Sequence, residues 1–365
     1  MFAYPWVVQK PLGSERALEL LQRSVKSKQF TNGGPVKHEL ETFLHRLLKL
    51  DEDHRVQMAA SGTAALHALV GAYNILHKKR LRWVTQAFTF PSSLLGPCKG
   101  SLVVDNDPVY LGPSLSALEA TKDEFDGVIV TNVFGTLVEM NIYVEWCKAN
   151  GKILLFDNAA TPLSFIDGSN TCNQGDGAII SFHETKALGR GEGGCVCIPH
   201  ELYALVVRAC NFGFKYGQHV RQCHSEASNW RMSDIAAAFL YARLELIKPF
   251  TISEAFVLDQ IAHDEIAKSK HLKAFCPPRK NEQRFVSCLC IHTPIQVNLE
   301  EFHKYSSIEA KRYYIPLAEE SDAPVAWTWY KSIVCLPFDY TGNPQKICES
   351  IQVLDRFVCE ILEKC

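Results

Sequence analysis

The sequence of 365 residues lacks the features that mark several large classes of protein. It has no uninterrupted apolar run of the roughly 18 residues that cross a bilayer, so no membrane span is predicted. Internal repeats and low-complexity tracts are absent, which argues against solenoids and disordered tracts. The N-terminal stretch MFAYPWVVQKPLG has neither the basic start nor the long apolar run of a signal peptide. We therefore expect a soluble protein of the reducing cytoplasm.

An excess of one charge and Cys-x-x-Cys pairs are also missing. The net charge of -2 and the pI near 6.7 give no global field for nucleic acid or anionic membrane, so a small-molecule partner is expected. The 14 cysteines include no Cys-x-x-Cys pair, and no metal site is predicted. Cys195/Cys197 and Cys288/Cys290 lie in apolar runs, where strand spacing places both thiols of a pair on one face and favours packing.

Strand-like and helix-like segments alternate through the first two thirds of the chain. Short apolar runs typical of buried strands occupy residues 83–90, 127–135, 152–160 and 177–182. Helical patterns occupy residues 40–48, 61–76 and 233–247. This alternation predicts an α/β fold with a mostly parallel mixed sheet flanked by helices.

The length of the chain is sufficient for a large domain and a smaller one. Pro249 follows the last of these helical patterns and marks the expected exit from the large domain. A final amphipathic helix is indicated by Ile351, Leu354, Val358 and Ile361. We therefore predict a large domain over residues 1–248 and a small α+β C-terminal domain over residues 249–365.

Three chemically useful residues follow buried strands. LLFDNAA leaves Asp157 at a strand end, and SFHETKALGRGEGG places Ser181 and Lys186 after the next strand. Alone, Asp157 would be interpreted as a turn residue and Lys186 as a solvated lysine. Together they match the needs of pyridoxal 5'-phosphate: a carboxylate for the ring nitrogen, a donor for the phosphate and an amine for the aldehyde.

The sequence resembles the DegT/DnrJ/EryC1/StrS family of pyridoxal phosphate-dependent sugar aminotransferases. Seven blocks carry the resemblance in family order over residues 31 to 317: FTNGGPVKHELE, SGTAALHALV, AFTF, FDNAA, GDGAIISFHETKALGRGEGG, NWRMSDIAAA and YYIPL. The resemblance implies a fold-type I transferase, with a large cofactor-binding domain and a smaller C-terminal domain.

The resemblance also implies roles for single residues. Lys186 would form the covalent link to the cofactor and act as the catalytic acid and base, and Asp157 would hold the ring nitrogen protonated. The backbone of Gly62 and Thr63, the Thr63 hydroxyl and Ser181 would hold the phosphate. A plain helix N-cap is the alternative interpretation of the Ser-Gly-Thr stretch, and one segment can serve both purposes.

Two further cofactor contacts depend almost wholly on the resemblance. Phe90 would stack on the pyridine face, although a core phenylalanine has the same appearance in sequence. Asn229 would reach the cofactor phosphate of a second subunit, which implies a homodimer with shared active sites. Without the family, Asn229 would be interpreted as a helix cap.

The substrate side is less specific. Lys215, His219 and Arg221 are candidates for binding a diphosphate, with an ordinary solvated loop as the alternative. Tyr314 is a candidate for the sugar pocket. In the family the Asp-Ala-Ala sequence is usually followed by Gln or His near the phenolic oxygen of the cofactor, whereas this chain has Ala160 there. Asn158 or Thr161 is the expected substitute. A histidine that often follows the YYxPL block is replaced by Ala318.

The resulting prediction is an aminotransferase that moves an amino group from glutamate to a nucleotide-linked keto-deoxysugar, at C3 or C4. Two alternatives remain at the level of sequence. One is a dehydratase on the same scaffold, although family members of that kind replace the Schiff-base lysine by histidine. The other is a non-catalytic member that serves as a ligand sensor or an assembly protein.

Overall fold

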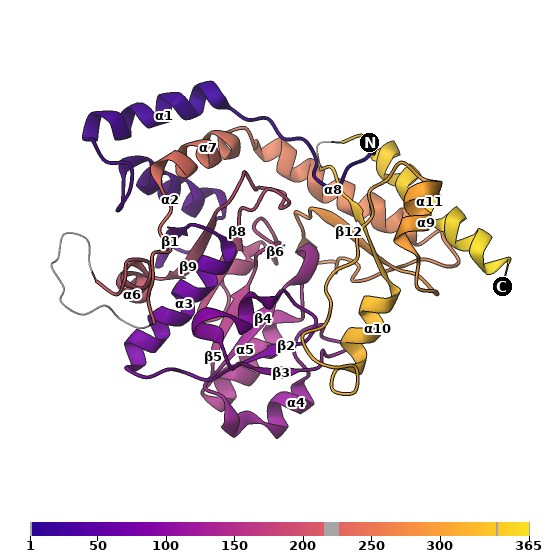
Figure 1. Cartoon of the computed structure of the whole chain (residues 1–365), viewed down its shortest axis with the longest axis horizontal. Helices are drawn as coiled ribbons and strands as arrows, with labels where there is room; N and C mark the ends of the chain where they lie inside the picture. Colours follow the sequence, from indigo (N-terminus) through magenta and orange to yellow (C-terminus); the bar gives the residue numbers. More distant parts are fainter. Residues whose placement is uncertain (1, 215–225, 341, 365) are drawn as a thin grey trace.

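The computed structural model describes residues 2–214, 226–340 and 342–364, and its centre is a seven-stranded sheet (Figure 1). In spatial order the strands are β1 (His54–Ala59), β9 (Gly194–Pro199), β8 (Gly177–Ser181), β5 (Ile153–Asp157), β4 (Gly127–Thr131), β2 (Trp83–Gln86) and β3 (Leu102–Val104). Only β9 runs against its neighbours, so the predicted mostly parallel sheet is confirmed.

Helices cover both faces of this sheet because successive residues of each buried strand point to opposite sides. Leu154 and Ile180 join the core that contains residues of α1, α2 and α7, whereas Leu155 and Ile179 pack with α3 and α6. The helices of this part of the chain are α1 (Ser14–Ser27), α2 (Pro35–Leu47), α3 (Gly62–His77), α4 (Leu115–Ala120), α5 (Met140–Asn150), α6 (His200–Cys210) and α7 (Asp234–Glu245). The molecule is therefore a three-layer α/β structure.

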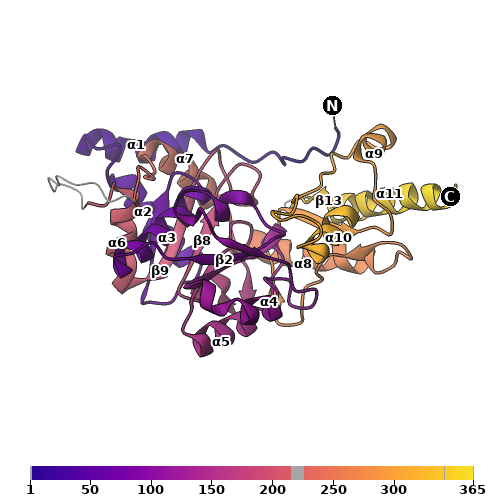
Figure 2. The same cartoon turned by 60° about the horizontal axis from the view of Figure 1, so that its bottom comes forward.

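The C-terminal elements lie together at one end of the molecule (Figures 1 and 2). Their helices are α8 (Pro249–Ile266), α9 (Leu299–Tyr305), α10 (Pro324–Ser332) and α11 (Pro344–Leu362). One small antiparallel sheet contains β10 (Lys273–Ala274), β12 (Cys288–His292) and β13 (Ile333–Pro337). Another joins β11 (Glu282–Gln283) to β6 (Phe165–Ile166) and β7 (Ser169–Asn170). Short 3-10 helices occupy Pro91–Leu94, Gly96–Cys98, Lys122–Glu124, Val133–Gly135 and Thr171–Asn173.

The N-terminal segment crosses from α1 to the C-terminal elements (Figures 1 and 2). Tyr4 is buried there and its backbone nitrogen donates to Ser307 at 3.1 Å. One hydrophobic cluster contains Tyr4, strands of the large sheet and residues of α11. Helix α8 does begin at Pro249, but because the cores are continuous, the division at residue 248 stays a prediction. Across the described ranges no helix has the length and apolar character needed to span a bilayer.

The buried strands end earlier than the apolar runs that indicated them. The runs at residues 83–90, 127–135, 152–160 and 177–182 contain β2, β4, β5 and β8, and in each the last residues leave the sheet at its carboxyl edge. The paired thiols Cys195/Cys197 lie in β9 and Cys288/Cys290 in β12, where all four are buried. The carboxyl edge is where the chemically useful residues gather.

Candidate active site

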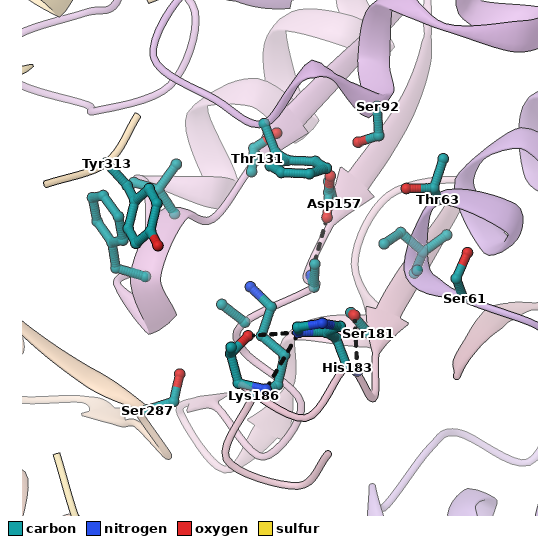
Figure 3. Close-up of a pocket in the computed structure, with 18 of the residues that line it drawn as sticks. Ser61, Thr63, Ser92, Thr131, Asp157, Ser181, His183, Lys186, Ser287 and Tyr313 are labelled. Carbon is teal, nitrogen blue, oxygen red and sulfur yellow. Dashed lines mark hydrogen bonds between the residues drawn. The ribbon is translucent and has the colours of Figure 1, made fainter. Parts of the chain in front are cut away.

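A cavity of about 690 Å³ lies at the carboxyl ends of the parallel strands (Figure 3). Thr131, Asp157 and Ser181 are the last residues of β4, β5 and β8, and all three line the cavity. Lys186 reaches the same cavity from the loop between β8 and β9. Parallel strands present their carboxyl ends at one edge of a sheet, so residues far apart in sequence meet there. The structure thus brings together Asp157, Ser181 and Lys186.

The Lys186 amine is available for chemistry. Its Nζ atom forms no hydrogen bond or ion pair with any described residue, although the backbone of Lys186 is held by the His183 carbonyl at 2.8 Å. Burial lowers the pKa of the Lys186 ammonium, while the smaller effects of Cys288 and Asp157 act in the opposite direction. A buried lysine with a lowered pKa is the form in which this side chain serves as nucleophile and base.

The glycines after Lys186 are required by the tight path of the loop. A Cβ atom on Gly189 would lie 1.8 Å from the His183 carbonyl oxygen, and one on Gly194 would lie 2.3 Å from the Ser61 carbonyl oxygen. Gly191 has a φ of +63°, which L side chains rarely adopt. These glycines therefore both connect β8 to β9 and let the loop fold closely around the lysine.

Asp157 is a buried carboxylate with an incomplete set of partners. Its Oδ1 accepts a hydrogen bond from the Ala159 nitrogen at 3.0 Å, and its Oδ2 has no hydrogen-bond partner among the described residues. Burial raises the pKa of Asp157, and the hydrogen bond and the Lys186 charge offset this only in part. A buried carboxylate of this kind is stabilised by a cationic partner, which the protonated ring nitrogen of pyridoxal phosphate would provide.

The beginning of α3 lies against the end of β8 and forms the anion-binding side of the cavity. Ser61 is the N-cap residue, and its hydroxyl accepts from the Ala64 nitrogen at 3.1 Å. The first turn of a helix leaves further N–H groups without helical partners, and Gly62 and Thr63 line the cavity there. A Cβ atom on Gly62 would lie 2.7 Å from the Ser181 Cβ, so only glycine permits this approach. The same helix start therefore provides a cap and, beside it, N–H groups that would suit the cofactor phosphate.

Aromatic side chains form the opposite side of the cavity. Phe90 is 51% exposed, so its ring is a wall of the cavity and not part of the core. Its edge meets Tyr314, with ring centres 6.2 Å apart, and Tyr314 is stacked on Phe134 at 5.0 Å. Figure 3 shows Tyr313 on the side of the cavity away from Ser61 and Thr63. The cavity therefore has a polar end for an anion and an aromatic end for a larger ligand.

The expected substitutes for the missing Gln or His do not reach the cavity. Asn158 is fully buried on the other side of the chain, where its Oδ1 accepts from Asn132 Nδ2 at 2.7 Å and its Nδ2 donates to Thr171 at 3.3 Å. Thr161 is also buried, and its hydroxyl has no hydrogen-bond partner among the described residues. Because consecutive residues point in opposite directions at a strand end, Asp157 faces the cavity and Asn158 cannot. That expectation was wrong, and Ala160 lines this part of the wall.

Other predicted residues lie away from the cavity. Asn229 is exposed, and its Oδ1 accepts from Arg231 Nε at 2.8 Å. It does not cap a helix, because Ser233 is the N-cap of α7 and accepts from the Ala236 nitrogen at 3.3 Å. Its contact with a second subunit stays a prediction. The candidate diphosphate ligands Lys215, His219 and Arg221 lie outside the described residues.

Sequence reasoning did not assign several residues of the cavity wall to the site, among them Trp6, Tyr313 and Cys288. Trp6 comes from the N-terminal segment, where its backbone nitrogen donates to Glu309 at 2.8 Å and its ring lies 5.8 Å from that of Tyr313. No local pattern around Trp6 indicates this contact. Two others had a signal in the sequence. Tyr313 is adjacent to the candidate Tyr314, and Cys288 lies in an apolar run.

Together, the amine, the carboxylate and the helix N-terminus on this sheet define the class of fold-type I, pyridoxal phosphate-dependent enzymes. Comparison with known families makes the assignment specific. Residues 11–352 match the DegT/DnrJ/EryC1/StrS aminotransferase family, so the chain belongs to this family of aminotransferases and its cofactor is pyridoxal 5'-phosphate.

Individual relatives are distant but match over most of their length. The chain is 23% identical over 315 residues to a dTDP-4-amino-4,6-dideoxy-D-glucose transaminase of Shigella dysenteriae, which covers 85% of this chain and 84% of the relative. It is similar in structure to a 3-amino-5-hydroxybenzoic acid synthase, with a TM-score of 0.83, 16% identity, and coverage of 97% and 99%. A Helicobacter pylori aminotransferase involved in the biosynthesis of pseudoaminic acid gives a TM-score of 0.80, 19% identity, and the same coverage. The structural likenesses support the fold alone.

Proposed function

We propose that this aminotransferase transfers an amino group from glutamate to the keto group of a nucleotide-linked deoxysugar, at C3 or C4. Support for the substrate class comes from the names of relatives, among them the dTDP-sugar transaminase of Shigella dysenteriae and a GDP-perosamine synthase of Vibrio cholerae. The single observation that carries the chemistry is the unpaired Lys186 amine, which shares a cavity with the buried Asp157 carboxylate.

Each residue has a role that follows from its surroundings. Pyridoxal phosphate, when bound, supplies an aldehyde that carries the amino group and a ring that withdraws electrons from the adjacent carbon. Lys186 would remove a proton from the carbon that bears the donor's amino group, and would return one to the carbon of the acceptor sugar. Asp157 would hold the ring nitrogen protonated. The N–H groups of Gly62 and Thr63, with the Ser181 hydroxyl, would hold the phosphate.

The aromatic end of the cavity suits a sugar ring. Trp6, Tyr313 and Tyr314 form its wall, and aromatic faces pack well against the apolar faces of a deoxysugar. Phe90 would cover the cofactor ring. Diphosphate binding would fall to Lys215, His219 and Arg221.

We further propose that the enzyme is a homodimer in which Asn229 completes the partner's phosphate site. Its exposed position is compatible with a contact across an interface. In a test, the inactive Lys186→Ala and Asn229→Ala chains are mixed. If each site takes Lys186 from one subunit and Asn229 from the other, one site of a mixed dimer carries both defects and the other site carries none. The shared site therefore predicts that mixing recovers part of the activity. Lack of any recovery, with mixed dimers verified, would contradict the shared site.

The substrate assignment is tested by incubating the holoenzyme with glutamate and a panel of nucleotide-linked 3-keto and 4-keto sugars, with the products measured by mass spectrometry. The expected product carries an amino group in place of the keto oxygen, and Lys186→Ala should form none. No transfer to any member of the panel would remove the substrate proposal and leave the cofactor assignment intact.

A further inference from the structure

A second, smaller cavity lies behind the loop that carries Lys186. Its volume is about 110 Å³, enough for several water molecules or one tetrahedral oxyanion. It lies between the N-terminal segment, the end of α7, the beginning of α8 and the residues after β13. The residues that line it are Val8, Gln9, Lys10, Pro11, Arg243, Leu246, Ile247, Thr251, Asp339 and Tyr340.

Arg243 is a buried guanidinium with no described carboxylate in direct contact. It is 3% exposed, and its only hydrogen bond to a described residue goes from Nη2 to the Tyr340 hydroxyl. Its Nε is buried and has no hydrogen-bond partner among the described residues, and no described carboxylate lies within 4.0 Å of the guanidinium. A guanidinium has five N–H donors, and burying it with most of them unpaired is destabilising. Donors of this guanidinium that face the cavity would be stabilised by an anion or ordered water.

Lys10 places a second cation on the same cavity. Its side chain is 5% exposed, and Nζ lies 3.8 Å from the Glu184 carboxylate and donates to the Glu184 carbonyl. An ammonium has three protons, so two remain for other acceptors. Burial is the main cause that lowers the pKa of Lys10 to about 8; the Glu184 charge opposes it, and the Arg243 and Arg190 charges act in the same direction as burial. This ammonium would be stabilised by a negative ligand.

The helix geometry favours an anion at the same place. Thr251 belongs to the first turn of the 18-residue helix α8, which has no side-chain cap. Backbone N–H groups in this turn lack helical acceptors, and the helix dipole is positive there. Two carboxylates lie near the positive charges of Lys10 and Arg243. Glu184 is paired with Arg190 at 3.3 Å, and Asp339 lies on the cavity wall.

We infer that this cavity binds a small tetrahedral oxyanion, inorganic phosphate or sulfate, between Lys10, Arg243 and the N-terminus of α8. The anion would join the N-terminal segment to α7 and α8. Because Lys10 also holds the Glu184 carbonyl, two residues before Lys186, the anion would stiffen the loop that positions the catalytic amine. The site is separate from the cofactor phosphate site, which the holoenzyme keeps filled.

The direct test is a crystal of the holoenzyme soaked with selenate, a tetrahedral oxyanion whose selenium scatters anomalously. An anomalous peak within hydrogen-bonding distance of the Arg243 guanidinium and of Lys10 Nζ is expected. Density for water alone, at a selenate concentration that gives peaks elsewhere, would overturn the inference.

A solution test uses thermal unfolding of the holoenzyme in phosphate and in sodium chloride of equal ionic strength. Phosphate at about 100 times its Kd should raise the Tm by on the order of 3 °C. Arg243→Gln and Lys10→Met should each abolish this rise. Arg16→Gln, a matched change of an exposed arginine on α1, should keep it. An equal rise in all four proteins, or none in the wild type, would contradict the site.

Discussion

The carboxylate of Asp157 offers the sharpest test of the active site. Asp157→Asn removes the charge but keeps an oxygen that can accept the hydrogen bond from Ala159, now 3.0 Å long. The shape of the buried site should therefore be retained, and cofactor content should remain close to that of the wild type. What changes is the electrostatic partner of the ring nitrogen.

The magnitude follows from the burial of the site. A charge pair at about 4 Å with an effective dielectric constant near 20 contributes about 4 kcal/mol. At 1.36 kcal/mol per unit, this is roughly three pKa units on the ring nitrogen. Loss of the pair would leave the ring mostly unprotonated at neutral pH and weaken its withdrawal of electrons. The half-reaction with the amino donor should slow by roughly 10²- to 10³-fold.

The assay is a stopped-flow measurement of the cofactor absorbance after mixing with glutamate, normalised to bound cofactor. Asp176→Asn is the control, since Asp176 also accepts a backbone hydrogen bond, from Leu154 at 2.8 Å, but lies before β8 and away from the cavity. It should react at nearly the wild-type rate. A rate for Asp157→Asn within tenfold of the wild type, with full cofactor, would refute the proposed pairing.

Three further outcomes are expected. Borohydride reduction of the holoenzyme followed by peptide mapping should label Lys186; a label on another lysine would remove the assignment. Gly62→Ala should destabilise the protein by about 1–3 kcal/mol in urea unfolding and weaken cofactor binding, because its Cβ would lie 2.7 Å from that of Ser181. An ordinary helical Gly→Ala change stabilises a protein by about 1 kcal/mol. A stabilising effect of Gly62→Ala would therefore contradict the close approach to Ser181. In oxyanion-free buffer the pKa of Lys10 is about 8 in the folded chain, against an ordinary 10.5. As the pH rises, the folded chain therefore loses this proton at a lower pH than the unfolded chain does. The free energy of unfolding should therefore gain roughly 3 kcal/mol between these pH values. Lys10→Met should lack that gain, and equal pH profiles would contradict it.

The fold and the central residues of the site could be predicted from sequence because their signals are local. Buried parallel strands are continuous apolar runs, and the residue that ends each run lies at the ligand-binding edge. Asp157 and Ser181 were identified in this way, and Lys186 by the glycine-rich segment that follows it. The family resemblance added Tyr314, and also Phe90, for which a core phenylalanine has the same appearance in sequence.

Orientation is where sequence reasoning failed. Asn158 is chemically suited to replace the missing Gln or His, but it is the neighbour of Asp157 and points to the opposite side of the strand end. The hydrogen bonds of its amide to Asn132 and Thr171 hold it there. Residue type alone also suits both Asn229 and Ser233 to cap α7, and only the backbone path decides that Ser233 does so.

The sequence by itself determined the alternation of strands and helices and the order of the motifs, and it singled out Lys186 as the candidate amine. Only the tertiary structure decided which distant segments share a cavity. Trp6 in the active site, and Lys10 beside Arg243 behind it, are contacts between residues far apart in the chain, brought together when the N-terminal segment crosses to the C-terminal elements. The physical reason is that a local pattern reports which face of an element is buried, whereas its neighbours are chosen by the packing of the whole chain.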